Sequence, residues 1–152
     1  MIVDAICYVL HMVFGTLLTG SVLYVALAVN PTAVAGDIQP DALKQVTGRL
    51  TTVSRSSAVV LFLTGGHQAG NFYSIEMLTG TFRGHLVLAM LVLWLVLTAL
   101  VEIGSARLRE GLDADKLREP AREARPFLRA GAVVAVLLLV DAGLLASPVA
   151  PY

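Results

Sequence analysis

Residues 5–29 read AICYVLHMVFGTLLTGSVLYVALAV, a stretch without Asp, Glu, Lys or Arg. A helix needs about 20 mainly apolar residues to cross the ~30 Å hydrocarbon core of a bilayer, so this stretch can span it with some tilt. Its one readily ionisable side chain is His11. An ionisable group at membrane depth is costly and normally faces a bundle interior, where it finds partners. The partners of His11 are therefore the functional question.

Helical spacing groups the polar residues of this stretch on one side. At about 100° per residue, Asp4, Cys7, His11, Gly15 and Leu18 fall on one narrow face. The flanking faces carry apolar residues suited to lipid or bundle packing, namely Ile6, Val9, Leu10, Val13 and Leu17. We expect the face that holds His11 to contact other helices.

The whole composition is that of a membrane protein. The chain has 152 residues, of which 57% are hydrophobic and 14% charged, and its mean hydropathy is +0.78. Apolar segments predict helices over about 4–30, 41–66, 84–108 and 127–146, the second being apolar mainly after Ala58. We therefore expect an all-α fold, a single integral membrane antiparallel four-helix bundle over residues 1–152.

Basic residues predict the orientation of this bundle in the cell membrane. They crowd the connection between the third and fourth segments, and Lys44 and Arg49 lie on the same side. The members in that connection are Arg107, Arg109, Lys116, Arg118, Arg122, Arg125 and Arg129. By the positive-inside rule, the 30–43 and 106–128 connections are cytoplasmic. The 66–83 loop and both termini are then external.

The second segment has a polar first half and two deep arginines. If the helix ends at the pair Gly65 and Gly66, Arg55 lies roughly 15 Å below its outer end, close to mid-membrane, where a guanidinium needs acceptors. Arg49 is then about as deep as Glu102 on the third segment. We predict a structural ion pair between Arg49 and Glu102, with snorkelling of Arg49 to the headgroups as the alternative.

All three histidines lie in the predicted outer half, together with two carboxylates. We expect His11, His67 and His85 to form a metal site, because imidazole binds copper, zinc and haem iron. Asp4 and Asp141 would orient the imidazoles through their second nitrogens. Cys7 is a soft group that favours Cu(I).

Structural alternatives stay open for each of these residues. A membrane histidine can serve only as an interhelical hydrogen-bonding group. Cys7 can be an inert small apolar residue, and Asp141 can form a structural pair with Arg55. If all of these hold, the protein is a non-catalytic membrane subunit whose polar layer locks the bundle.

Several positions resemble a known family over about residues 5–110. Leu10-His11, Gly20, Leu23-Tyr24 and Pro31, followed by Arg49, Thr64-Gly65 and a basic run after the third helix, resemble copper resistance D (CopD)-like membrane domains. The resemblance implies copper handling at the outer face, and it carries over His11. The first helix is also similar to that of HemJ-type proteins, which are linked to haem synthesis and to b-type haem.

Two functions follow from these patterns. The first is copper binding or transport through the outer histidine cluster. The alternative is a haem b site for electron transfer, with His11 and His85 as axial ligands and Arg55 or Arg83 meeting a propionate.

No Ser/His/Asp order or HExxH pattern is present, so we lean against an enzyme. The lipid bilayer is the expected partner; a second copy or a membrane partner subunit could complete the site. A net charge of +0 gives no indication of nucleic-acid binding.

Overall fold

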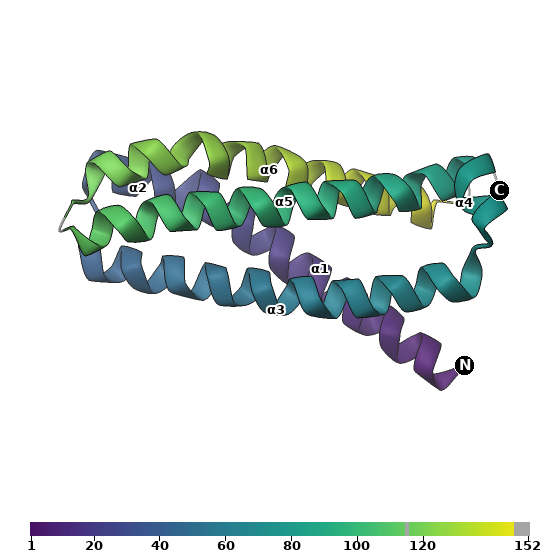
Figure 1. The fold of residues 1–152 in the computed structure, drawn as a ribbon. Coiled ribbons are helices and arrows are strands. Elements are labelled where there is room, and N and C mark those ends of the chain that lie inside the picture. Colours follow the sequence, from purple (N-terminus) through teal and green to yellow (C-terminus); the bar gives the residue numbers. More distant parts are fainter. Residues whose placement is uncertain (115, 148–152) are drawn as a thin grey trace.

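The computed structural model describes residues 1–114 and 116–147 of the chain, and this part is all-α, without a strand. Figure 1 shows the elements in order. They are α1 (Ile2–Tyr24), the π-helix η1 (Val25–Val29), α2 (Asn30–Ala35), α3 (Pro40–Phe72), α4 (Ile75–Gly80), α5 (Phe82–Asp113) and α6 (Arg118–Ala146). The predicted all-α class is confirmed.

The long helices lie side by side and alternate in direction. α3, α5 and α6 run along one another, and the continuous helix made by α1, η1 and α2 crosses beside them at an angle (Figure 1). α1 packs against both α3 and α6, and α5 packs against both α3 and α6. Asn30, where η1 meets α2, is buried and donates from Nδ2 to the Ala121 carbonyl at 2.9 Å. This bond fixes the inner end of the crossing helix on α6.

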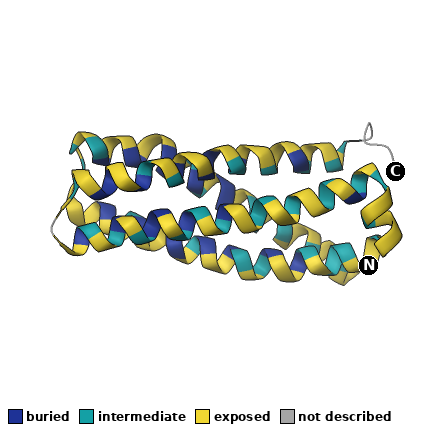
Figure 2. Cartoon of the chain, turned by 45° about the horizontal axis from the view of Figure 1, so that its top comes forward, coloured by how far each residue is buried: buried dark blue, intermediate teal, exposed yellow. Residues whose placement is uncertain are grey.

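Within the part of the chain that the structure describes, three helices are long and apolar enough to cross a membrane: Ile2–Ala35, Phe82–Asp113 and Arg118–Ala146. Their outward faces are exposed along most of their length (Figure 2), and many of these exposed side chains are Ile, Leu and Val. α3 is not among the three, because its first half is polar. The fully buried core residues, such as Leu18, Val22, Leu97 and Leu128, lie away from the end that carries α4.

The expected break at Gly65 and Gly66 does not occur. α3 continues through both glycines and through Gly70 to Phe72. A glycine inside a helix costs only about 1 kcal/mol relative to alanine, and packing of this part of α3 on α1 offsets that cost. The structure also extends α5 and α6 beyond the predicted apolar segments toward the α5–α6 turn.

The longer α3 changes the partner of Glu102. The carboxylate of Glu102 accepts from Arg55 Nε at 2.8 Å and Nη2 at 2.9 Å, where the sequence predicted Arg49. Lys44 pairs with Asp113 in the same antiparallel register. Arg49 lies roughly 9 Å nearer the α5–α6 turn than Arg55 along α3. Arg55 is roughly 25 Å from the outer end of α3 rather than 15 Å, and it is engaged with Glu102 rather than with Asp141.

Candidate metal site

The polar face of α1 contacts α3, as the helical spacing predicted. Asp4, Cys7, His11 and Gly15 are half-buried, and Leu18 is buried. The flanking residues Ile6, Val9, Leu10, Val13 and Leu17 are all exposed. We call the contact between this face of α1 and residues 61–71 of α3 the α1–α3 seam.

His11 is held in one tautomer by its partner on α3. Its Nδ1 lies 2.9 Å from Thr64 Oγ1, and the Thr64 hydroxyl donates its own hydrogen to the Val60 carbonyl at 2.7 Å. A hydroxyl has a single hydrogen, so toward His11 it can only accept. We therefore assign the proton of the neutral ring to Nδ1, which leaves the lone pair of Nε2 available to a ligand.

The neighbouring glycine makes room for the ring. A Cβ built on Gly65 would lie 3.1 Å from Cε1 of His11 and 3.6 Å from its Nδ1. Such a separation is tighter than ordinary van der Waals contact, so a side chain at this position would push the imidazole away from Thr64. Thr64 and Gly65 thus act together, one as the hydrogen-bond acceptor and the other as the open space beside it.

His67 lies on the same seam with Asp4 as its partner. Nε2 of His67 is 3.1 Å from Asp4 Oδ1, which accepts in this contact when Nε2 is protonated. Asn71 Nδ2 lies 3.4 Å from His67 Nδ1 and 2.9 Å from its Nε2. Asp4 also accepts from the amino group of Met1 at 2.6 Å. The carboxylate predicted to orient an imidazole therefore contacts His67.

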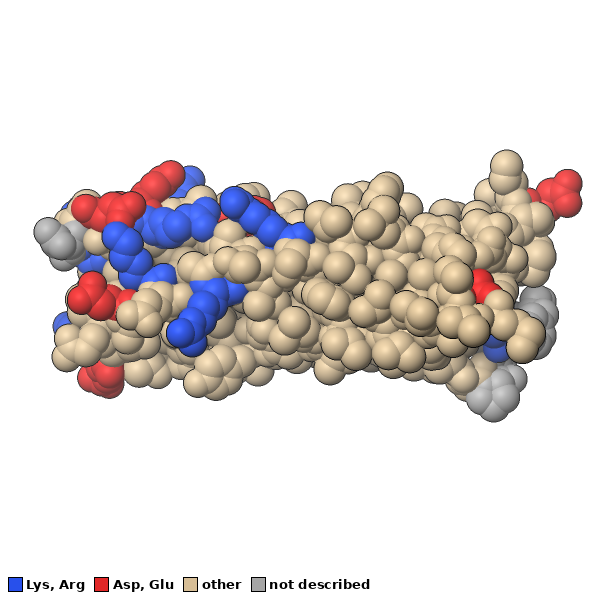
Figure 3. Space-filling view, turned by 90° about the horizontal axis from the view of Figure 1, so that it is seen from below, with Lys and Arg blue, Asp and Glu red and all other residues tan. Residues whose placement is uncertain are grey.

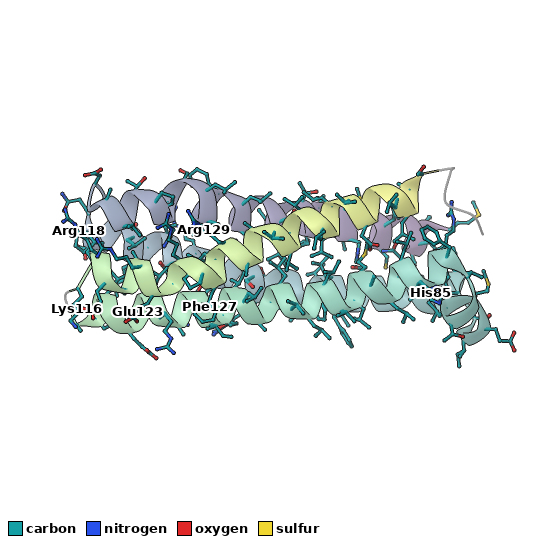
Figure 4. All side chains as sticks on the ribbon, turned by 90° about the horizontal axis from the view of Figure 1, so that it is seen from above. His85, Lys116, Arg118, Glu123, Phe127 and Arg129 are labelled. Carbon is teal, nitrogen blue, oxygen red and sulfur yellow. The ribbon has the colours of Figure 1, made fainter. Side chains whose placement is uncertain are left out.

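His85 points elsewhere. It is exposed at the start of α5 (Figure 4), and its Nε2 donates to the Thr79 carbonyl of α4 at 2.9 Å. This bond joins α4 to α5, whereas the bonds of the other two histidines join α1 to α3. Among residues 1–114 and 116–147, no group of three or more His, Cys, Asp and Glu side chains could hold a metal ion.

Asp141 is a buried residue of α6, in a part of the bundle where few other side chains are buried. Its exposed fraction is 6%, and its Oδ2 has no hydrogen-bond partner among the described residues. Two contacts give the antiparallel register of α6 on α1. Asn30 bonds to Ala121, and Val22 lies 3.5 Å from a Cβ built on Gly131. Cys7 is a free thiol.

Thr64 and Gly65 are the site residues that sequence reasoning assigned to other tasks. Both were interpreted as the end of a helix. The sequence around Thr64 has no unusual composition that would mark it as a site residue. The available signal was spacing: Thr64 precedes His67 by three residues, so both lie on one face of any helix that continues past Gly65.

Comparison with models of known protein families gives a match. The family model described as Copper resistance protein D (CopD) matches residues 44–146. This segment contains Thr64, Gly65, His67 and Asp141, whereas α1 with His11 lies outside it. Searches of curated proteins and of solved structures find no match.

Proposed function

The chain belongs to the copper resistance protein D (CopD) family of membrane proteins, and from this premise we propose that it binds copper at the α1–α3 seam. The observation that carries the proposal is the contact of His11 Nδ1 with Thr64 Oγ1, whose hydroxyl also bonds to the Val60 carbonyl; from it we infer an unprotonated Nε2. A metal-ligating imidazole usually donates its other ring hydrogen to a fixed acceptor, and Thr64 supplies that acceptor.

Cys7 is the second donor that we assign to copper. It lies one helical turn from His11 on the same half-buried face of α1, a spacing that brings Cβ atoms to about 5–6 Å. A thiolate with an imidazole is a soft donor pair, and soft donors select Cu(I). Copper is then the cargo of the protein, handled by a small donor set at the seam.

Asp141 would serve this site through charge. By the register given by Asn30–Ala121 and Val22–Gly131, Asp141 lies in the same half of the bundle as His11. A buried carboxylate without a partner is favourable only when it is neutral or a cation is nearby. Arrival of copper supplies that cation, so we propose that copper binding releases a proton from Asp141.

We also propose that α3 crosses the membrane, which completes an antiparallel four-helix bundle. α3 has 33 residues, against 32 in α5, beside which it lies. Its hydroxyl groups support burial in the bundle, since Thr47, Thr51, Ser54, Ser57 and Thr64 all point inward and are buried. Charged side chains gather at the end with the α5–α6 turn (Figure 3). We place that end in the cytoplasm and α4 outside.

Titration of the purified protein with Cu(I) against a competing chelator tests the copper site. We expect His11→Ala and Cys7→Ala to weaken binding at least tenfold. His85→Ala is the matched control, because this histidine bonds to the Thr79 carbonyl of α4 and not to the α1–α3 seam, and the variant should bind copper as the wild type does. Unchanged affinity in His11→Ala would refute the site. A Soret band in the purified protein would identify haem instead.

A further inference from the structure

Four arginines form a stripe along the first part of α6. Arg118, Arg122, Arg125 and Arg129 are spaced by four, three and four residues, which confines them to a sector of about 60° of the helix surface. We call these residues the arginine stripe. Figure 4 shows Arg118 and Arg129 on the side of α6 that faces the crossing helix, and Lys116 and Glu123 on the opposite side toward α5.

The charges of the stripe are not neutralised within the described part of the chain. The ion pairs near this end join Lys44 to Asp113, Arg55 to Glu102, and Lys116 to Glu119. No stripe arginine takes part in one there, and Nε of Arg125 is buried without a hydrogen-bond partner. Four guanidinium groups within roughly 16 Å of helix repel one another unless an anion lies among them.

The stripe ends where the apolar surface of α6 begins. From Ala130 to Ala146 the only charged residue of α6 is Asp141. Gly104 of α5 packs against Phe127 and Leu128, so Glu102 and Arg129 lie at about the same level of the bundle. The charged residues of α5 and of α6 therefore end at about the same level of the bundle, apart from Asp141 and the residues at the α4 end. We infer that this level is the boundary between headgroups and hydrocarbon, because charged side chains avoid the hydrocarbon.

The neighbouring surface suits a lipid tail. The crossing helix beside the stripe exposes Tyr24 and Leu27. At the end of α2, the guanidinium of Arg118 lies against Gly36, whose φ of 86° favours glycine and where an added Cβ would be only 2.4 Å from Arg118 Nε. The backbone thus leaves room for the arginine, on the crossing helix that also exposes the apolar side chains.

We propose that the arginine stripe binds the phosphate groups of anionic phospholipids in the inner leaflet. Guanidinium groups bind phosphate oxygens through paired hydrogen bonds, which a lysine cannot reproduce. Basic residues beside a membrane span attract anionic lipids generally. The stripe adds a fixed geometry, with the donors held on one helix face beside an apolar surface. The bound lipid would hold α2 and η1 against α6.

Thermal unfolding and native mass spectrometry in neutral detergent, with added phosphatidylglycerol or phosphatidylcholine, test this site. We expect phosphatidylglycerol to raise the melting temperature of the wild type by several degrees more than phosphatidylcholine does. The variant R122Q/R125Q/R129Q should lose that difference and bind phosphatidylglycerol at least tenfold more weakly. The variant R49Q/R107Q/K116Q removes three positive charges elsewhere at the same end and should keep both properties.

Further arms identify the ligand and guard against misfolding. Inorganic phosphate at the same concentration should give no shift, because the site also uses the lipid tail; a full shift with phosphate alone would overturn the assignment to lipid. The single variant R122Q changes an exposed side chain and should lose part of the lipid selectivity if the triple variant fails to fold. Equal selectivity in R122Q and wild type would overturn the proposal. Copper affinity should be the same in every variant, so this test is separate from that of the copper site.

Discussion

The side chain of His11 on α1 bonds to that of Thr64 on α3 at 2.9 Å, and Thr64 in turn donates to its own helix. This relay fixes which imidazole nitrogen carries the proton. It also joins two helices that are far apart in the sequence, so the chemistry of the imidazole depends on how α1 and α3 pack.

Replacing Thr64 tests how much its hydrogen-bond acceptor contributes to copper binding. Thr64→Val removes the oxygen that accepts from Nδ1 while keeping the shape of the side chain. We expect Cu(I) affinity to fall by about tenfold to a hundredfold, the usual cost of losing such a partner. Thr64→Ser keeps the hydroxyl and should restore most of the affinity in the same chelator competition. Equal affinity in the Val and Ser variants would show that the relay has no part in binding.

Gly65 and Gly66 form a matched pair for a second prediction. Alanine at Gly66 meets nothing within 4 Å and should stabilise the helix by up to about 1 kcal/mol. Alanine at Gly65 meets the His11 ring at 3.1 Å, so the gain should be cancelled or reversed, and copper binding should weaken. Melting temperatures of the two variants in detergent check this difference. Equal stabilisation by both would mean that the ring does not lie against Gly65.

We expect Asp141 to lower the free energy of unfolding of the copper-free protein. A buried carboxylate with an unpartnered oxygen carries a desolvation cost, which Asp141→Asn reduces and Asp141→Leu removes. We expect Asp141→Leu to stabilise the copper-free protein by about 1 kcal/mol or more. The same variant should bind copper more weakly and release fewer protons on binding, measured in lightly buffered solution. Glu76→Gln, which changes an exposed carboxylate, is the control for both measurements.

A double-mutant cycle tests the register of α3 on α5. Arg55→Gln and Glu102→Gln should show a coupling energy beyond that of additive pairs, because the two side chains share two hydrogen bonds. The parallel cycle with Arg49→Gln and Glu102→Gln should show none beyond about 0.3 kcal/mol. A larger coupling for Arg49 would place the two helices in a different register.

The local sequence pattern was sufficient to predict a membrane protein and to predict which face of α1 points inward. Both depend on short-range periodicity, and the alternation of half-buried His11 with exposed Leu10 and Met12 follows from helix geometry alone. The three membrane-capable helices likewise follow from composition. The assignment to a copper-resistance family was also correct, although the match begins after the helix that suggested it.

The errors arose where tertiary packing decides the outcome. Gly65 and Gly66 have the composition of a helix end, yet α3 continues because α1 packs on it there. Every depth counted from that supposed end was short, and so Glu102 was assigned to Arg49. His85 was placed correctly along its helix, but the direction of its ring depends on the Thr79 carbonyl of a short helix that the sequence did not predict.

The seam makes His11 a reporter of mechanical alignment. A slide of α1 against α3 by one residue, roughly 1.5 Å, is enough to break the bond to Thr64. The ring would then be free to exchange its proton between the two nitrogens. The nitrogen-15 chemical shifts of this single imidazole consequently record whether the two helices are in register, without any ligand present.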